Sequence, residues 1–91
     1  MTFIWDMNKS IKNVRKHGVS FETAQIAFFD EKRKIFKDQK HSEHEERYFC
    51  YGLVDGEILT VRFTIRKDSI RIIGAGYWRK GRKIYYENQQ R

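Results

Sequence analysis

Asp55–Arg66 reads DGEILTVRFTIR, and this stretch decides the fold class of the chain. Asp55-Gly56 is its strongest hairpin signal, because a two-residue turn needs residues that tolerate positive φ. After the turn, apolar and polar residues alternate with a period of two, which predicts a strand with one apolar and one basic face. The apolar face comprises Leu59, Val61, Phe63 and Ile65. The opposite face comprises Thr60, Arg62, Thr64 and Arg66.

Further strands are predicted on both sides of this segment, where apolar or β-branched residues lie between turn signals. They are Thr2–Trp5, Lys34–Asp38, Arg47–Val54 and Ser69–Ala75. Lys67-Asp68 provides a second tight turn, and the polar segment Gln39–Glu46 is predicted to be a loop.

Three helices are predicted outside these strands. The first begins after the N-cap Asp6 and ends at Gly18, which tolerates the left-handed conformation of a C-cap. Its apolar face comprises Met7, Ile11 and Val14. The second follows the N-cap Ser20, and its apolar stripe comprises Phe21, Ala24 and Phe28. The third is predicted over Arg79–Gln90, although Gly81 weakens its first turn.

The predicted fold class is therefore α+β. An antiparallel sheet of about four strands carries the two N-terminal helices on one face, and a C-terminal helix follows. We expect the apolar side of Glu57–Arg66 to meet the early helices, and its threonine and arginine side to face solvent or a ligand. A chain of 91 residues is expected to form a single domain, residues 1–91.

The charge of the chain favours polyanionic partners. Nineteen Lys and Arg against twelve Asp and Glu give a formal net charge of +7. Nucleic acid, an anionic membrane surface or an acidic protein would suit this charge, and solubility alone is a further explanation. The single cysteine, Cys50, permits no disulfide within the chain, and no apolar run is long enough to span a membrane. We therefore expect a cytoplasmic protein without a membrane partner.

The basic strand face is the first candidate site. Arg62 and Arg66 are four residues apart on one strand, which places them about 13 Å apart on one side. This spacing suits a phosphate backbone, although a solvated face balanced by carboxylates is an equal alternative. Further charge nearby in the sequence comes from Arg71, Arg79, Lys80, Arg82 and Lys83, and Arg71 could point to either face.

Aromatic residues are interleaved with this charge. Tyr77 and Trp78 precede Arg79, and Tyr86 follows in the predicted helix. Aromatic rings beside cations can stack on unpaired bases while the cations hold phosphates. The alternative is that Trp78 is a core residue that anchors the last helix, whereas Tyr77 is expected on the surface at the end of the sheet.

The segment His41–Arg47 reads HSEHEER, with Cys50 beyond it. Two histidines near a cysteine suggest a metal site, but the spacing matches no closed zinc pattern, so no metal or other cofactor is expected. General acid–base catalysis by His41 or a neighbouring glutamate fits the segment better. Arginines would then stabilise the charged phosphorane of RNA cleavage. A solvated loop is the alternative.

Several segments together resemble the BrnT family of bacterial toxins. FIWD at residues 3–6 and KHGVSFE at residues 16–22 open the pattern. D-x-x-H-S at Asp38–Ser42, the pair Glu46-Arg47 and the run Arg71-Ile72-Ile73 continue it. The resemblance extends over nearly the whole chain, and its specificity comes from the combination of segments.

The resemblance implies a RelE-like fold and a ribonuclease toxin that reduces translation within a type II toxin–antitoxin system. It also implies a BrnA antitoxin with a ribbon-helix-helix domain, through which the complex contacts DNA. Catalysis in such folds tends to use arginine, lysine, tyrosine and histidine on the open sheet face, without metal. Many members continue after Arg-Ile-Ile with Ser-Ala-Arg, where this chain has Gly74-Ala75-Gly76. Arg79 or Tyr77 would then have to replace that arginine.

The leading hypothesis is a metal-independent endoribonuclease that cleaves RNA by attack of its own 2′-hydroxyl. The predicted catalytic residues are His41, Arg47, Arg66, Arg71 and Tyr77. The predicted RNA-binding residues are Arg62, Arg79, Lys80 and Tyr86. The alternatives are a non-catalytic nucleic-acid-binding module, and a structural component of a repressor complex whose basic face docks an acidic antitoxin segment.

Overall fold

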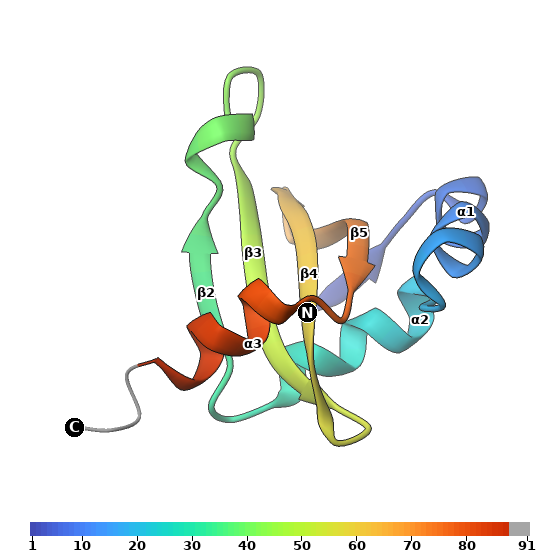
Figure 1. Ribbon diagram of the computed structural model, residues 1–91. Helices are drawn as coiled ribbons and strands as arrows, with labels where there is room; N and C mark the ends of the chain where they lie inside the picture. Colours follow the sequence, from blue (N-terminus) through green and yellow to red (C-terminus); the bar gives the residue numbers. More distant parts are fainter. Residues whose placement is uncertain (88–91) are drawn as a thin grey trace.

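A computed structural model describes residues 1–87 and has a five-stranded sheet at its centre (Figure 1). The strands are β1 (Thr2–Ile4), β2 (Lys34–Lys37), β3 (Arg47–Val54), β4 (Glu57–Arg66) and β5 (Ser69–Gly76). The α-helices are α1 (Met7–His17), α2 (Phe21–Ala24) and α3 (Arg79–Tyr86). The 3₁₀ helices are η1 (Gln25–Phe29) and η2 (Gln39–His41), and η2 lies inside the segment predicted to be a loop.

The α+β class is confirmed, but the prediction of about four antiparallel strands is wrong. The strand order is β1-β5-β4-β3-β2, in which β2 to β5 are antiparallel neighbours and β1 pairs in parallel with β5. Parallel neighbours need a long connection, and here residues 5–68 lie between β1 and β5. A local pattern identifies a strand but not its distant partner, so the sequence could not reveal this pairing.

The turn between β3 and β4 is as predicted. Asp55 and Gly56 have φ values of 51° and 82°, and the pairing of Val54 with Glu57 closes a two-residue hairpin. Between β4 and β5 the register shifts next to Arg62, which pairs with Gly74, whereas the following residue pairs with Ile72. One extra residue on β5 forms this bulge.

The core lies between the sheet and the helical segment α2–η1. Buried side chains of this segment are Phe21, Ala24, Ala27 and Phe28. They meet the predicted apolar face of β4, of which Leu59, Val61 and Phe63 are buried. Ile65 is 57% exposed, so its predicted burial is wrong. The second predicted helix is a single α turn that continues as a 3₁₀ helix.

The contact of η1 with β3 depends on Gly52. A Cβ at Gly52 would overlap the backbone of Ala27, so the helical segment can approach the sheet only because no side chain intervenes. This close approach sets the distance between η1 and β3.

The capping of α1 is as predicted, but its packing is not. The Asp6 carboxylate accepts hydrogen bonds from two backbone N–H groups of the first turn, and Gly18 ends the helix with a φ of 71°. The predicted apolar face, Met7, Ile11 and Val14, is 46–65% exposed. The buried side chains are Ser10 and Asn13. Asn13 donates to the backbone carbonyls of Val19 and Ala75, so polar contacts fix α1 beside β5.

The other face of the sheet is covered by α3, which lies across β3 and β4 (Figure 1). Gly81 permits this, since a Cβ there would overlap the hydroxyl of Thr60. A small second core forms from Tyr51, Ile58 and Tyr85. The prediction that the threonine and arginine side of β4 is open is therefore wrong in part, because Thr60 and Thr64 are buried.

The predicted end of the third helix lies beyond the described part of the chain. Helix α3 begins at Arg79, as predicted, and extends to Tyr86. The predicted residues 88–90 fall outside the described residues. Within residues 1–87, no helix combines the length and apolar character that crossing a membrane requires.

Candidate functional site

The predicted site residues fall into two groups at opposite ends of β4. One group lies where β3 begins and β4 ends, and comprises His41, Arg47, Arg62 and Arg66. The other lies beside the β3–β4 turn and α3, and comprises Tyr77, Arg79 and Tyr86. The ten residues of β4 separate its two ends by roughly 30 Å. His41 and Tyr77, the two acid–base candidates named from the sequence, therefore lie in different groups.

At the first end, the buried carboxylate of Asp38 organises the surrounding side chains. Asp38 Oδ2 lies 2.9 Å from His41 Nδ1 and 4.0 Å from a guanidinium nitrogen of Arg62. The side chain of Asp38 is 5% exposed, whereas that of His41 is 56% exposed. The imidazole is thus held at its inner nitrogen and presents its outer nitrogen, Nε2, to solvent. We call Asp38, His41, Arg47, Arg62 and Arg66 the His41 cluster.

The protonation of this pair follows from its contacts. Burial acts to raise the pKa of Asp38, but the hydrogen bond and charge of His41, the N–H of Lys40 and the charge of Arg62 lower it overall. Asp38 is therefore a carboxylate, which can only accept a hydrogen bond. Nδ1 of His41 must then carry the proton, and in neutral His41 the exposed Nε2 is free to accept one.

Four hydrogen bonds, from hydroxyl and backbone groups, hold the loop that carries His41. Ser42 Oγ donates to the carbonyl of Asp38 at 2.7 Å and accepts from the backbone N–H of Arg47 at 3.0 Å. The Asp38 N–H donates to the Arg47 carbonyl at 2.7 Å. Thr64 Oγ1 donates to the carbonyl of Glu46 at 2.8 Å, which explains why Thr64 is buried. The position of His41 is thus fixed by the fold.

Charged side chains of both signs lie beside the exposed imidazole. Arg47 and Arg66 both contact Glu45, at 3.7 and 3.3 Å. An open hollow of about 390 Å³ lies among these groups. Its lining residues are Lys40, His41, Glu43, His44, Glu45, Arg47 and Arg66. The hollow joins an oriented imidazole with guanidinium groups, which suits proton transfer beside a phosphate.

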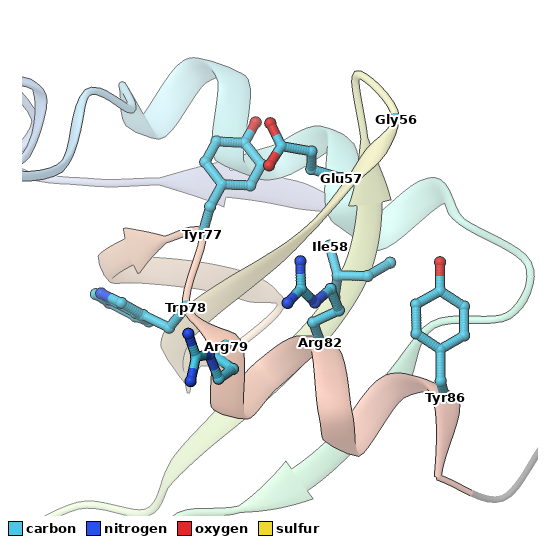
Figure 2. Close-up of a pocket in the computed structure, with 8 residues that line it drawn as sticks. All are labelled: Gly56, Glu57, Ile58, Tyr77, Trp78, Arg79, Arg82 and Tyr86. Carbon is cyan, nitrogen blue, oxygen red and sulfur yellow. The ribbon is translucent and has the colours of Figure 1, made fainter.

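The second end of β4 holds a separate hollow of about 300 Å³, here called the hairpin-end pocket (Figure 2). It is lined by Gly56, Glu57, Ile58, Tyr77, Trp78, Arg79, Arg82 and Tyr86. Figure 2 shows the Glu57 carboxylate and the Tyr77 hydroxyl pointing toward each other above the two arginines. Burial, together with the charges of Asp55 and Glu57, raises the pKa of Tyr77. The pocket therefore combines neutral aromatic groups with two cations.

Trp78 is neither a core residue nor fully exposed. Its side chain packs on Gly76, and its ring meets that of His17 edge-on with centroids 5.1 Å apart. The residue is 38% exposed and forms one wall of the hairpin-end pocket. The interpretation of Trp78 purely as a core anchor is wrong.

Three further residues named in the sequence line neither hollow. Arg71 pairs with Thr64, which in turn pairs with Arg47, so Arg71 lies on the same sheet face two strands away from Arg47. Lys80 is exposed on α3 but does not line the hairpin-end pocket. Cys50 is fully buried on the opposite sheet face, with its thiol 3.9 Å from the Ala27 carbonyl oxygen, so it does not approach His41.

Sequence reasoning gave no site role to Asp38 or Glu57, and named Arg82 only as added charge. Asp38 could have been found, because an N-cap aspartate three residues before a histidine places both on one turn. Arg82 could also have been found, since it lies one helical turn after Arg79. Glu57 carries no such signal, because its role depends on α3 folding back over the turn.

A comparison with known families identifies one match. The family model described as a ribonuclease toxin, BrnT, of type II toxin–antitoxin systems matches residues 5–81. No curated protein matches the chain. The matched stretch contains the whole His41 cluster and ends before Arg82 and Tyr86, which line the hairpin-end pocket.

Proposed function

Because the chain belongs to the BrnT family of ribonuclease toxins of type II toxin–antitoxin systems, we propose that the His41 cluster is the site at which it cleaves RNA as an endoribonuclease. The observation that supports this most is the contact of His41 Nδ1 with the buried Asp38 carboxylate. It leaves the exposed Nε2 as a proton acceptor beside several guanidinium groups.

The proposed reaction uses protein side chains and the RNA itself. Nε2 of His41 takes the proton of a 2′-hydroxyl, whose oxygen attacks the adjacent phosphorus. The new bond joins the 2′-oxygen to phosphorus, and the bond from phosphorus to the 5′-oxygen breaks. The departing 5′-oxygen takes a proton from water or from His44, which lines the same hollow. Arg47 and Arg66 stabilise the negative charge of the phosphorane.

Membership of a type II toxin–antitoxin family implies that the chain has an antitoxin as its partner. We propose a BrnA-like antitoxin with a ribbon-helix-helix domain, so that the toxin meets DNA only within the complex. Cleavage of cellular RNA would then inhibit translation whenever the antitoxin is absent.

The test is RNA cleavage by the purified chain, free of antitoxin and in the presence of EDTA. We expect His41→Gln to slow cleavage about 10²–10⁴-fold, since it removes the proton acceptor. Arg66→Gln should also slow cleavage, whereas Arg15→Gln, an equal loss of charge on exposed α1, should not. Circular dichroism melts of each variant control for folding.

Two results would overturn the proposal. If His41→Gln cleaves RNA as fast as the wild type, the cluster is not the active site. If the wild type binds RNA tightly but leaves it intact, the chain is a nucleic-acid-binding module. Loss of activity with EDTA would show that the reaction needs a metal.

A further inference from the structure

The hairpin-end pocket gathers exposed aromatic rings at one place. Tyr77, Trp78 and Tyr86 are 36%, 38% and 49% exposed, and all three line the pocket. They come from the segment after β5 and from the last turn of α3, and Figure 2 shows them around a common space. Flat aromatic side chains held open to solvent in this way offer stacking surfaces for planar ligands.

Two guanidinium groups complete the same pocket. Arg79 and Arg82 are one turn apart on α3, and both extend into the space between the aromatic rings (Figure 2). None of the five ion pairs found within residues 1–87 includes either arginine. The first turn of α3 has no acidic residue, and its N-cap Trp78 makes no side-chain capping bond. The pocket thus offers the guanidinium groups of Arg79 and Arg82 to an anion, with Glu57 as its one acidic lining residue.

From these features we propose that the hairpin-end pocket binds one nucleotide of a single-stranded nucleic acid, with its base stacked on the aromatic rings and its phosphate held by Arg79 and Arg82. A volume of about 300 Å³ lies at the small end of ligand pockets, which suits a single nucleotide rather than a duplex. The Glu57 carboxylate lines the wall and can accept hydrogen bonds from N–H groups of a base.

This inference rests on the proposed ribonuclease function and adds a second contact for the RNA substrate. The pocket and the His41 cluster lie at opposite ends of β4, roughly 30 Å apart. A strand that reaches both is held at two points, so the pocket would select long single strands over short ones. The pocket itself recognises base and phosphate and does not require a 2′-hydroxyl.

The test is binding of a fluorescein-labelled single-stranded oligodeoxynucleotide, which lacks the 2′-hydroxyl that the proposed cleavage needs. Fluorescence anisotropy gives Kd for the wild type and for Arg79→Gln, Tyr86→Ala and Lys80→Gln. Arg79 and Lys80 are neighbours of equal charge on α3, but Lys80 does not line the pocket. We expect Tyr86→Ala to weaken binding at least about fivefold, because base stacking on one ring is lost. Arg79→Gln should weaken it more than Lys80→Gln does.

A nucleoside monophosphate should compete with the oligodeoxynucleotide at concentrations where inorganic phosphate does not, because only the nucleotide can stack. Equal effects of Arg79→Gln and Lys80→Gln would overturn the proposal, since they would indicate attraction by net charge alone. A Kd for Tyr86→Ala equal to that of the wild type would also overturn the proposal. RNA cleavage tests the His41 cluster and oligodeoxynucleotide binding tests the pocket, so failure of one proposal can be told from failure of the other.

Discussion

The indole ring of Trp78 lies directly against Gly76, where a Cβ would overlap the ring. This contact sets the position of Trp78 between the ring of His17 and the hairpin-end pocket. No side chain can occupy position 76 while Trp78 stays in place. The presence of glycine at position 76 is thus coupled to the position of Trp78.

The first prediction concerns this glycine. Gly76→Ala should lower the free energy of unfolding by about 1–3 kcal/mol, because the ring must move or the strand must shift. Gly74→Ala is the matched control on the same strand, since its Cβ would meet Arg62 Cδ at an ordinary 3.7 Å. Urea unfolding of both variants, followed by tryptophan fluorescence, checks this. Equal stability of the two variants would contradict the proposed packing.

The second prediction compares two buried threonines on one face of β4. Thr64 donates to the Glu46 carbonyl, whereas the hydroxyl of Thr60 has no hydrogen-bond partner within residues 1–87. Thr64→Val should therefore destabilise the chain by about 1–2 kcal/mol, because the Glu46 carbonyl loses its donor. Thr60→Val should be neutral or stabilising, since it removes an unpaired hydroxyl. Thermal unfolding of both variants measures these effects. A larger loss of stability in Thr60→Val than in Thr64→Val would show that the hydrogen bonds of the two hydroxyls are not as described.

The third prediction is a pH dependence that comes from Asp38. Burial acts to raise its pKa, but the contacts with His41 and Arg62 lower it below its ordinary 3.8. A carboxyl whose pKa is lowered by folding contributes stability above its unfolded pKa, and this contribution is lost as the pH falls through the folded value. Asp38→Asn should therefore be less stable than the wild type at pH 7, by about 1–3 kcal/mol.

The difference between Asp38→Asn and the wild type should begin to shrink below about pH 4, where the carboxyl of the unfolded chain becomes protonated, and should shrink further as the pH falls through the lowered pKa of the folded state. Urea unfolding at a series of pH values between 3 and 7 measures it. A difference that stays constant over this range would show that the charge of Asp38 is not the stabilising feature.

The fourth prediction concerns the only cysteine. Burial raises the pKa of the Cys50 thiol to about 12. Because the thiolate is the reactive species, native protein at pH 8 should not react with a disulfide reagent such as dithiobis-nitrobenzoate, whereas protein unfolded in urea should react fully. Rapid labelling of the native chain would show that Cys50 is accessible.

Several parts of the fold follow from the sequence alone, because they depend on a few neighbouring residues. The turn at Asp55-Gly56 needs only residues that tolerate positive φ, and both have it. The caps Asp6 and Ser20 act on backbone N–H groups two or three residues away. The alternation along β4 identified buried Leu59 and its neighbours for the same reason, since the period of a strand is local.

Only the tertiary structure decided which of these surfaces is covered. Ile65 continues the alternation of β4, yet it lies beyond the reach of α2 and η1 and is exposed. Thr60 belongs to the polar face, yet α3 buries it. Which segment covers a face depends on the packing of distant elements, and the pattern of one strand holds no information about that packing.

For the site, too, the sequence and the tertiary structure decided different things. The sequence identified the residue types, a histidine beside carboxylates and arginines beside aromatic rings. The fold placed His41 and Tyr77 near opposite ends of β4, and brought Asp38, the N-cap of η2, to Arg62 of β4. A side chain's chemistry is fixed by its residue type, whereas the distance between two side chains is fixed only when the strands that carry them pair in register.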